Sequence, residues 1–516
     1  MSFALLKAQS IADNWYFGLQ AGVRFTEEGP VALMDSEMIA GEGCATISNP
    51  SGELLFYTDG DTVWNRNHLP MPNGTGLLGN TSSTQSAVIC PFPLSPDKYF
   101  IFTVPHLGGP DGLRYSIVDM TLDAGFGDID TSNKNILITT PVCEKVTAVE
   151  KCDRTGYWIV THDFGSNEIY VYELTSSGLN ETPVVSNGEV EIDSTVGFQS
   201  AGYMKASPDG KMIAMCHEAK HLVELFKFNN QTGMLSEPII IDPPFVTNNT
   251  AMRPYGLEFS PNSTLLYVSP RFFYEGYVRQ FNLAVYDSVA INSSEHILND
   301  SISSGALQLG PDGRIYGSNL YHLSQITNPN EIGLAANLVD SAISLNNRWS
   351  TVGLPNFIQS IFNNPIPRKT ICIGDSVLFN VEDSCAEAIL WNFGDPGSGA
   401  ANTSTAANTW HTFSDTGRFI VTLTMQYASV SDTFTNEIKV LRSPYVGGSP
   451  NKHFICNSDS IVLDAEQPFI SDYIWSTGSD SSAIAVSDSG VFICTITNFC
   501  GEATDSFYVD FDTIPT

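Results

Sequence analysis

The chain has 516 residues, a formal net charge of −32, and 42% apolar residues. This apolar fraction excludes a chain that is disordered by composition, and the scarcity of Lys and Arg excludes a nucleic-acid-binding protein, which needs clusters of these residues to contact phosphates. No apolar run reaches the roughly 18 residues that a membrane-spanning helix needs, so we expect no membrane insertion.

The first ten residues, "MSFALLKAQS", look like the last part of the apolar region of a secretory signal. The basic residues that normally precede such a region are missing. We therefore expect residues 1–11 to be a residual signal-peptide-like segment of an exported protein whose start lies upstream.

A turn motif recurs at intervals of about 50 residues in the segments "NPSGELLFY", "SPDGKMIAM" and "GPDGRIYGS", each time between two short apolar runs. Such a period, with three or four strands per unit, is typical of a β-propeller, in which a ring of sheets buries faces that one sheet would expose. In "SPDG", Ser or Asp accepts backbone N–H groups, Pro fixes φ and Gly supplies a positive φ. We therefore interpret the motif as a hairpin and not as a binding site. The six turns lie at Gly52, Lys98, Gly156, Gly210, Ser263 and Gly313.

A seventh sheet can be built from the two ends of this region. Residues 14–18 and 22–26 have the pattern of a second and a third strand, whereas residues 353–362, "GLPNFIQSIF", have the pattern of a first strand with no continuation. Pairing these segments would close the ring and remove its exposed edges. We therefore predict an all-β fold with a seven-bladed propeller over residues 12–365; a six-bladed ring is the alternative.

Four polar residues fall six to eight positions after their turns, at the ends of the predicted second strands. They are Asp59, His106, His162 and His217, and the last two stand beside Asp163 and Glu218. We expect them on one face of the ring, where they would form a polar rim that binds a ligand. The alternative is that they cap strand ends and bond neighbouring blades.

Arg253 and Arg271 stand beside aromatic residues in "TAMRPYG" and "SPRFFYEGYVRQ", with Arg279 nearby. Since arginine is scarce in this chain and its guanidinium matches a carboxylate, these residues are suited to recognising a carboxylate or a sugar. An ion pair between blades is the alternative.

The chain contains no Gly-x-Ser-x-Gly, His-Glu-x-x-His or P-loop motif, and "SPDGKMIA" lacks the Trp of a sialidase Asp-box. This favours a non-enzymatic protein, although a carboxylate pair for glycoside cleavage needs only spatial proximity and remains an alternative. We expect no metal and no other cofactor. Calcium is the alternative, because acidic, Asn-rich loops suit it even though none matches the EF-hand pattern.

After the linker "NNPIPRKT", residues 366–443 resemble a PKD domain, an immunoglobulin-like β-sandwich. The resemblance rests on "WNFGDPGSG" (391–399) and "HTFSDTGRFIVTLTM" (411–425). It implies that Trp391 is the core tryptophan and that Gly394 and Asp395 form the turn after its strand. We expect Cys372 and Cys385 to form a disulfide.

Residues 449–516 repeat this order around Trp475 and "DSGVFICTITN", which predicts a second immunoglobulin-like sandwich. Its three cysteines leave one unpaired. We favour a Cys456–Cys500 disulfide with Cys494 buried as a small hydrophobe; a Cys456–Cys494 disulfide, by analogy with the inter-sheet bridge of immunoglobulins, is the alternative. No CxxC pair occurs, so we expect no zinc site, and the spacings favour an oxidising compartment.

The propeller followed by "WNFGDP", "HTFSDTG" and "YIWSTG" resembles the large secreted surface proteins of the Bacteroidota. In that family such modules often precede a gliding-motility-associated or type IX secretion sorting domain, which implies export to the cell surface. This chain stops at "VDFDTIPT" without such a domain, so we expect either a fragment or another secretion route.

From these features we expect a secreted or cell-surface adhesion protein. Its propeller would recognise a glycan or a protein, and its two sandwiches would form a stalk. The alternatives are a secreted polysaccharide hydrolase or lyase with a propeller catalytic domain, and a structural spacer in a surface assembly.

Overall fold

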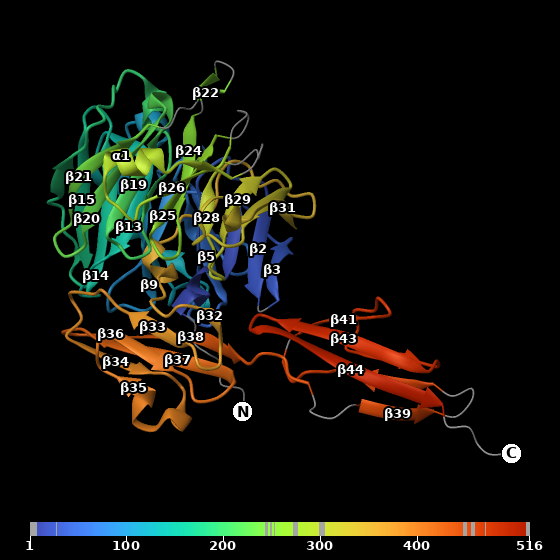
Figure 1. Cartoon of the computed structure of the whole chain (residues 1–516). Helices are drawn as coiled ribbons and strands as arrows, with labels where there is room; N and C mark the ends of the chain where they lie inside the picture. Colours follow the sequence, from blue (N-terminus) through green and yellow to red (C-terminus); the bar gives the residue numbers. More distant parts are fainter. Residues whose placement is uncertain are drawn as a thin grey trace. The chain divides into compact units, whose positions relative to one another are not determined.

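The computed structural model (Figure 1) describes residues 8–511, except residues 27, 243–245, 248–249, 252, 272–276, 299–304, 447–450, 456–459 and 470. The regular secondary structure of the described chain is mostly β-strand, and its α1 helix (Ser288–Ser293) is only six residues long. The chain divides into two compact units. The first comprises residues 1–363 and 428–430, and the second comprises residues 364–427 and 431–516. No helix of the described residues is long and apolar enough to cross a membrane.

Seven antiparallel sheets of three to five strands follow one another along the first unit, and we number them as blades in chain order. The first four blades are β1 (Asn14–Phe17), β2 (Ala21–Thr26) and β3 (Gly29–Leu33); β4 (Ala45–Ser48), β5 (Leu54–Thr58), β6 (Thr62–Asn65) and β7 (Pro70–Thr75); β8 (Ala87–Pro91), β9 (Lys98–Thr103), β10 (Leu113–Asp119), β11 (Asp128–Ile129) and β12 (Ile136–Thr139); and β13 (Val142–Glu150), β14 (Gly156–Asp163), β15 (Glu168–Thr175), β16 (Gly178–Leu179) and β17 (Val184–Asn187). The last three are β18 (Met204–Ala206), β19 (Met212–His217), β20 (Leu222–Asn229) and β21 (Met234–Ile241); β24 (Pro254–Phe259), β25 (Leu265–Pro270), β26 (Arg279–Asn282) and β27 (His296–Ile297); and β28 (Leu307–Leu309), β29 (Ile315–Asn319), β30 (His322–Ile326) and β31 (Leu338–Ser344).

These sheets form the predicted seven-bladed propeller. The first strands of the later blades, such as β18, β24 and β28, are buried along their whole length, because they lie at the centre of the ring. The ring closes where the first blade packs on the seventh: the ring centroids of Phe25 and Tyr316 are 5.3 Å apart, and those of Trp15 and Tyr316 are 5.7 Å apart. The all-β fold class and the seven blades are therefore confirmed.

The recurring turn is the hairpin between the first and second strand of a blade. In "SPDG", the N–H of Gly210 donates to the carbonyl oxygen of Ser207 at 2.8 Å, and Gly210 has a φ of +68°. The hydroxyl of Ser207 accepts from the N–H of Met212 at 3.0 Å. The motif is thus fully used in making the corner, as its turn chemistry predicts.

The predicted closing strand, residues 353–362, is wrong: no strand covers these residues within the fully described range 305–446. Trp15 and Phe357 are neighbours, with ring centroids 6.0 Å apart, but the two segments form no ladder. Pro355 has no N–H to donate. The segment instead runs through the centre of the ring, where the N–H of Asn356 donates to Cys44 and its side-chain Nδ2 donates to the carbonyl oxygens of Ala87 and Val146.

The second unit contains two sandwiches. In the first, β32 (Lys369–Cys372), β38 (Ser431–Leu441), β37 (Gly417–Gln426), β34 (Ala388–Asn392) and β35 (Thr403–Ser404) form one sheet, and β33 (Ser376–Asn380) and β36 (Asn408–Thr412) form the other. In the second, β39 (Asn451–Ile455), β44 (Gly501–Phe511), β43 (Gly490–Asn498) and β41 (Asp472–Trp475) face β40 (Ile461–Asp464) and β42 (Ala483–Val486). Trp391 is the buried core tryptophan of the first sandwich, as predicted, and Trp475 is buried in the core of the second.

Both favoured cysteine pairings are wrong, because Cys372 is bonded to Cys500. The reason lies in the packing: the β43–β44 hairpin of the second sandwich meets the end of β38 in the first, where the hydroxyl of Ser443 donates to the carbonyl oxygen of Cys500 at 2.8 Å. Cys372 ends β32, which pairs in parallel with the end of β38. Cys456 lies outside the described residues, and Cys494 is a buried free cysteine, as expected.

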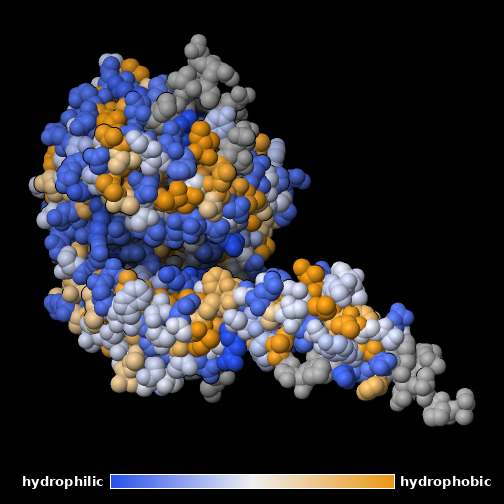
Figure 2. All heavy atoms as spheres, viewed as in Figure 1, coloured by the Kyte–Doolittle hydropathy of each residue, from blue (hydrophilic) through white to orange (hydrophobic). Residues whose placement is uncertain are grey.

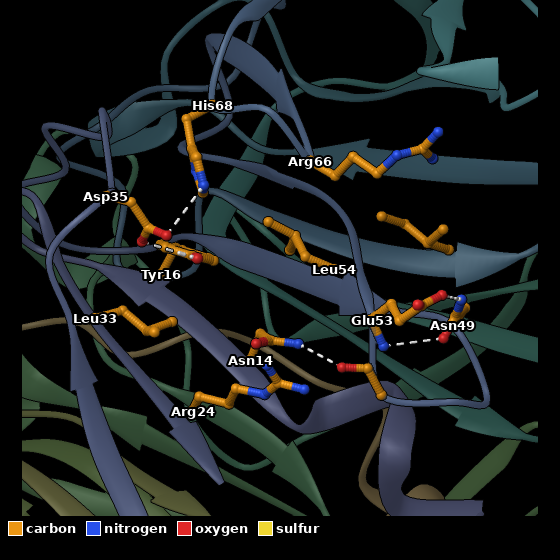
Figure 3. A pocket seen from close by; sticks show the side chains of 12 residues that line it. Asn14, Tyr16, Arg24, Leu33, Asp35, Asn49, Glu53, Leu54, Arg66 and His68 are labelled. Carbon is orange, nitrogen blue, oxygen red and sulfur yellow. Dashed lines mark hydrogen bonds and ion pairs between the residues drawn. The ribbon is translucent and has the colours of Figure 1, made fainter.

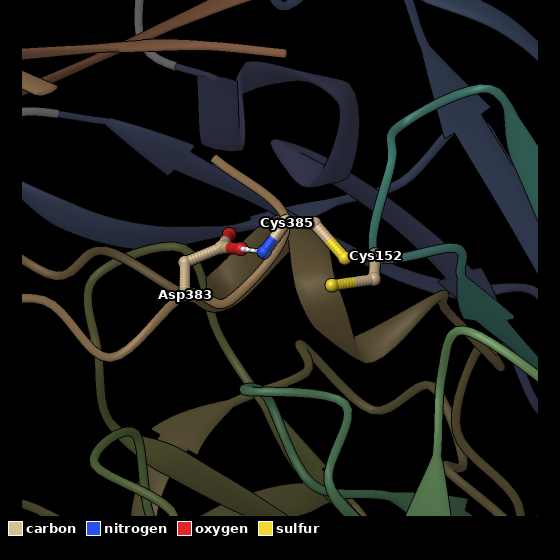
Figure 4. A group of neighbouring side chains, drawn as sticks. All are labelled: Cys152, Asp383 and Cys385. Carbon is tan, nitrogen blue, oxygen red and sulfur yellow. Dashed lines mark hydrogen bonds between the residues drawn. The ribbon is translucent and has the colours of Figure 1, made fainter. Parts of the chain in front are cut away.

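Cys385 belongs to a different disulfide. Its backbone N–H donates to the carboxylate of Asp383 at 2.8 Å (Figure 4). Because its sulfur is in a disulfide, Cys385 is not available as a thiolate ligand for a metal.

Candidate functional site

Three glutamates and two arginines meet at one face of the ring. Glu144 lies near the start of β13, and the other four lie on loops that leave second strands or enter first strands. One guanidinium joins two of the carboxylates: Arg271 Nη2 lies 2.7 Å from Glu42 Oε1, and Arg271 Nη1 lies 3.0 Å from Glu218 Oε2. Arg253 Nη1 lies 3.9 Å from the other oxygen of Glu218. We call Glu42, Glu144, Glu218, Arg253 and Arg271 the Glu–Arg cluster.

Glu42 contacts both an arginine and a tyrosine. The hydroxyl of Tyr255 donates to its Oε2 at 2.7 Å, and the Arg271 guanidinium lies over the Tyr255 ring, 5.3 Å from the centroid. Burial raises the pKa of Glu42 to about 7, although Arg271 and the Tyr255 hydroxyl oppose this shift. Burial also raises the pKa of Glu218 against the pull of Arg271. A carboxyl group with a pKa near 7 can gain or lose a proton at neutral pH.

Glu144 is held by its own set of donors. Its Oε2 accepts from the N–H and the hydroxyl of Thr84, at 3.0 and 3.2 Å, and its Oε1 accepts from the N–H of Leu107 at 2.7 Å and the hydroxyl of Ser200 at 3.1 Å. His106 Nε2 lies 3.8 Å from the same Oε1. Glu144 thus holds β13 of the fourth blade to the segments before β8, after β9 and before β18.

The two other predicted histidines come together in the interior. His162 and His217 are almost fully buried, with ring centroids 5.7 Å apart. His162 Nδ1 contacts the carbonyl oxygen of Asp163 at 2.7 Å, and His217 Nε2 contacts Glu224 at 3.2 Å. Burial, with the neighbouring His217, lowers the pKa of His162 to about 3, so this imidazole is neutral. These histidines join blades and do not face a solvent-exposed ligand.

Asp59 does not join the others. Its Oδ1 accepts from the backbone N–H groups of Asp61 and Thr62, at 3.0 and 2.8 Å. Asp59 therefore caps the β5–β6 turn. This is the strand-end role that was the alternative to ligand binding. Of the six predicted site residues, the structure brings His106, Arg253 and Arg271 to the Glu–Arg cluster, places His162 and His217 beneath the surface, and leaves Asp59 apart.

Sequence reasoning missed Glu42, Glu144 and Tyr255. For Glu144 the available signal was a charged residue inside an apolar first strand, "VCEKVTAVE", where Glu144 and Lys145 interrupt the run. Lys205 and Glu258 carry the same signal on β18 and β24, and their side chains form a buried pair at 2.6 Å. Buried charges require partners, so such interruptions indicate contacts across the ring.

A groove of about 680 Å³ lies between the first and second blades, at the end of the blades that carries the β4–β5 and β6–β7 turns (Figure 3). Arg24, Asn14 and Tyr16 line it from the first blade, and Leu54 and Arg66 line it from the second. Its volume is in the range of small-ligand sites.

No family model and no curated protein matches the chain. A solved structure from Bacteroides fragilis, provisionally named a 6-phosphogluconolactonase, has 14% sequence identity and a TM-score of 0.41; the match covers 66% of this chain and 97% of that one. A protein of the same provisional name from Bacteroides uniformis has 13% identity and a TM-score of 0.38, over 64% and 98% of the two chains. The extracellular domain of a hybrid two-component system from B. thetaiotaomicron has 11% identity and a TM-score of 0.36, over 83% and 56%. Similarity at this level identifies neither a ligand nor an activity.

Proposed function

We propose that the chain is a non-enzymatic binding protein of the cell surface or the extracellular space, with the propeller as its recognition head. The observation that carries this proposal is the contrast between two faces of the ring. The carboxylates of the Glu–Arg cluster are occupied by arginine, tyrosine and backbone donors, whereas the groove between the first two blades has two arginines without an ion-pair partner among the described residues. Unsatisfied charge at a concave surface favours ligand binding.

The proposed location rests on the disulfides and on the resemblance to secreted surface proteins of the Bacteroidota. Disulfides persist in oxidising compartments, and the chain has four described cysteines in disulfides. Export by a type IX route, with a role in adhesion or gliding, is part of the proposal. Protease shaving of intact cells tests it: the chain is cleaved outside the cell if it is at the surface and protected if it is not.

The tandem sandwiches suit a stalk. The Cys372–Cys500 disulfide joins the first sandwich to the β43–β44 hairpin of the second and limits their relative motion. A stiff stalk holds the propeller away from its attachment point. It also lowers the entropy lost when the propeller binds its ligand, because less motion remains to be restricted.

A secreted hydrolase or lyase acting on polysaccharide is the second candidate, and Glu42 supports it. A carboxyl with a pKa of about 7 can exchange a proton at neutral pH, and Glu42 is bridged by one guanidinium to a second carboxylate, Glu218. In this function Glu42 would be the acid or base, and Tyr255 would orient it.

An array of glycans and proteins, probed with the full chain with and without a chelator, tests both functions. Binding that releases no sugar product supports the binding protein. Release of reducing ends or unsaturated sugars that is abolished in Glu42→Gln favours the enzyme instead. Binding to nothing on the array overturns the recognition head and favours the structural spacer.

A further inference from the structure

Two walls from neighbouring blades form the groove between the first two blades (Figure 3). Asn14, Tyr16 and Arg24 stand on β1 and β2, and Leu33 and Asp35 continue this wall. The opposite wall begins at the β4–β5 turn, continues along β5 and ends in the β6–β7 turn, from which Arg66 and His68 project. The groove thus lies between the sheets of two blades, and each blade supplies one wall.

Arg24 and Arg66 are unusual in this acidic chain. Each lines the groove, and neither makes an ion pair or a side-chain hydrogen bond with any described residue. The guanidinium of Arg66 makes a cation–π contact with Phe126, whose ring centroid lies 4.8 Å from the guanidinium carbon. Elsewhere in the propeller, Arg271 and Arg279 are paired with glutamates. Two carboxylates also line the groove, but Asp35 contacts Tyr16 and His68, and Glu53 accepts from Asn49. The two unpaired guanidinium groups are therefore suited to a ligand with more than one negative charge.

Asn14 adds a hydrogen-bond acceptor at the base of the groove. Both hydrogens of its amide are used, because Nδ2 donates to the Ser48 hydroxyl and to the Gly52 carbonyl oxygen, each at 2.9 Å. These bonds fix the amide plane, and no described residue donates to Oδ1. An oxygen oriented in this way can accept a hydrogen bond from a ligand hydroxyl.

A chain of hydrogen bonds holds the end of the groove rigid. The Tyr16 hydroxyl donates to Asp35 Oδ1 at 3.1 Å, and His68 Nε2 lies 3.3 Å from Asp35 Oδ2. The Tyr57 hydroxyl contacts His68 Nδ1 at 3.3 Å, and the Tyr16 and Tyr57 rings are stacked with centroids 4.6 Å apart. A site on such a preorganised wall loses little entropy when it binds.

We propose that this groove binds an acidic oligosaccharide, a sugar chain that carries a carboxylate on at least two of its residues. The proposal rests on the proposed function and names the ligand class of its recognition head. Arg24 and Arg66 each bind one carboxylate through paired N–H donors, and Asn14 Oδ1 accepts from a ring hydroxyl. The planar fork of the guanidinium favours carboxylate, and hydroxyl recognition distinguishes a sugar from an acidic peptide.

The test is titration calorimetry of the full chain with an oligouronate and with the neutral oligosaccharide of the same linkage, at low and at physiological salt. We expect binding of the oligouronate that weakens with salt, and no binding of the neutral sugar. Arg24→Gln and Arg66→Gln should each weaken binding by about tenfold or more, since each removes a charge-assisted hydrogen bond. Asn14→Leu should also weaken binding of the oligouronate, because it removes the oxygen that accepts from the sugar hydroxyl.

The matched control is Arg418→Gln, which removes an arginine that is 68% exposed on the first sandwich and should leave binding unchanged. Circular dichroism and thermal melting of each variant show whether it is folded. The inference is overturned if the arginine variants bind the oligouronate as the wild type does, or if the neutral sugar binds equally well. If the chain binds another array ligand and ignores the oligouronate, the proposed function survives and this inference fails.

Discussion

Arg271 joins Glu42 and Glu218 in a single contact: its two terminal nitrogens lie 2.7 and 3.0 Å from one oxygen of each carboxylate. Glu42 precedes the second blade, Glu218 follows β19 of the fifth, and Arg271 follows β25 of the sixth. One guanidinium therefore ties together three blades that are far apart in the sequence. Its pKa is raised, because the two carboxylates outweigh the burial that opposes its charge.

Replacing this arginine should destabilise the propeller. Arg271→Gln leaves two buried carboxylates without their shared partner, and we expect the free energy of unfolding to fall by about 3 kcal/mol. Chemical denaturation monitored by tryptophan fluorescence measures it. Arg418→Gln, an exposed arginine in the first sandwich, should change the same quantity by less than about 0.5 kcal/mol. Equal effects of the two substitutions would show that the bridge contributes nothing.

Glu42 should make the stability depend on pH. Its pKa is about 7 in the folded chain against the ordinary value of 4.5, so between these pH values the folded state holds the proton more tightly than the unfolded state. The free energy of unfolding must then fall as pH rises from about 4.5 to 7, by roughly 3 kcal/mol from this group.

Glu42→Gln should remove this component, so its unfolding free energy relative to the wild type should rise across the same interval. Urea denaturation of both proteins at pH 5, 6, 7 and 8 measures the difference. Glu466→Gln, which changes an exposed carboxylate, serves as the control and should follow the wild-type profile. Parallel curves for Glu42→Gln and the wild type would contradict the raised pKa.

The repeated hairpins were predictable because turn chemistry is local. Gly210 needs its positive φ whatever the rest of the ring does, and the same holds for Gly52 and Gly313. The seven blades follow from the spacing of such corners. The course of residues 353–362 was not predictable, because the side chain of Asn356 finds its partners 269 and 210 residues away, in a channel that exists only once the ring has closed.

The candidate site was predictable only in part. Counting from each turn to the end of the second strand placed His106 on the correct face, because strand lengths are similar among blades. Glu42 and Tyr255 meet across 213 residues, and no local pattern carries that information. Disulfide connectivity likewise depends on how the sandwiches pack, so the partner of Cys500 could not be read from spacing.

Asn356 should be important for stability although it lies in no strand. Its Nδ2 donates to the Val146 and Ala87 carbonyl oxygens at 2.9 and 3.2 Å, and its Oδ1 accepts from the Gln85 amide at 3.2 Å. Asn356→Ala leaves these buried groups unsatisfied, and we expect a loss of about 3 kcal/mol in the free energy of unfolding. Asn408→Ala, at an exposed position of β36, should cost less than about 0.5 kcal/mol in the same assay. A small effect at Asn356 would mean that the channel relaxes around the cavity.

The Cys372–Cys500 disulfide should be measurable as a covalent link and as a source of stability. Peptide mapping without reductant should yield a linked pair of peptides that contain Cys372 and Cys500, and none that joins Cys372 to Cys385. Because the two cysteines are 128 residues apart, the cross-link restricts a large loop of the unfolded chain, and Cys500→Ser should lower the stability of the second unit by about 4 kcal/mol.

Reductant should lower the denaturation midpoint of the wild type toward that of Cys500→Ser, since both lack the cross-link. Cys494→Ala is the matched control, because Cys494 is a free buried cysteine, and this variant should keep the linked peptides. A linked pair that contains Cys372 and Cys385 in the wild type would overturn the connectivity. The two sandwiches would then have no disulfide between them. The stiffness that suits them to a stalk would depend on the contacts of the β43–β44 hairpin alone.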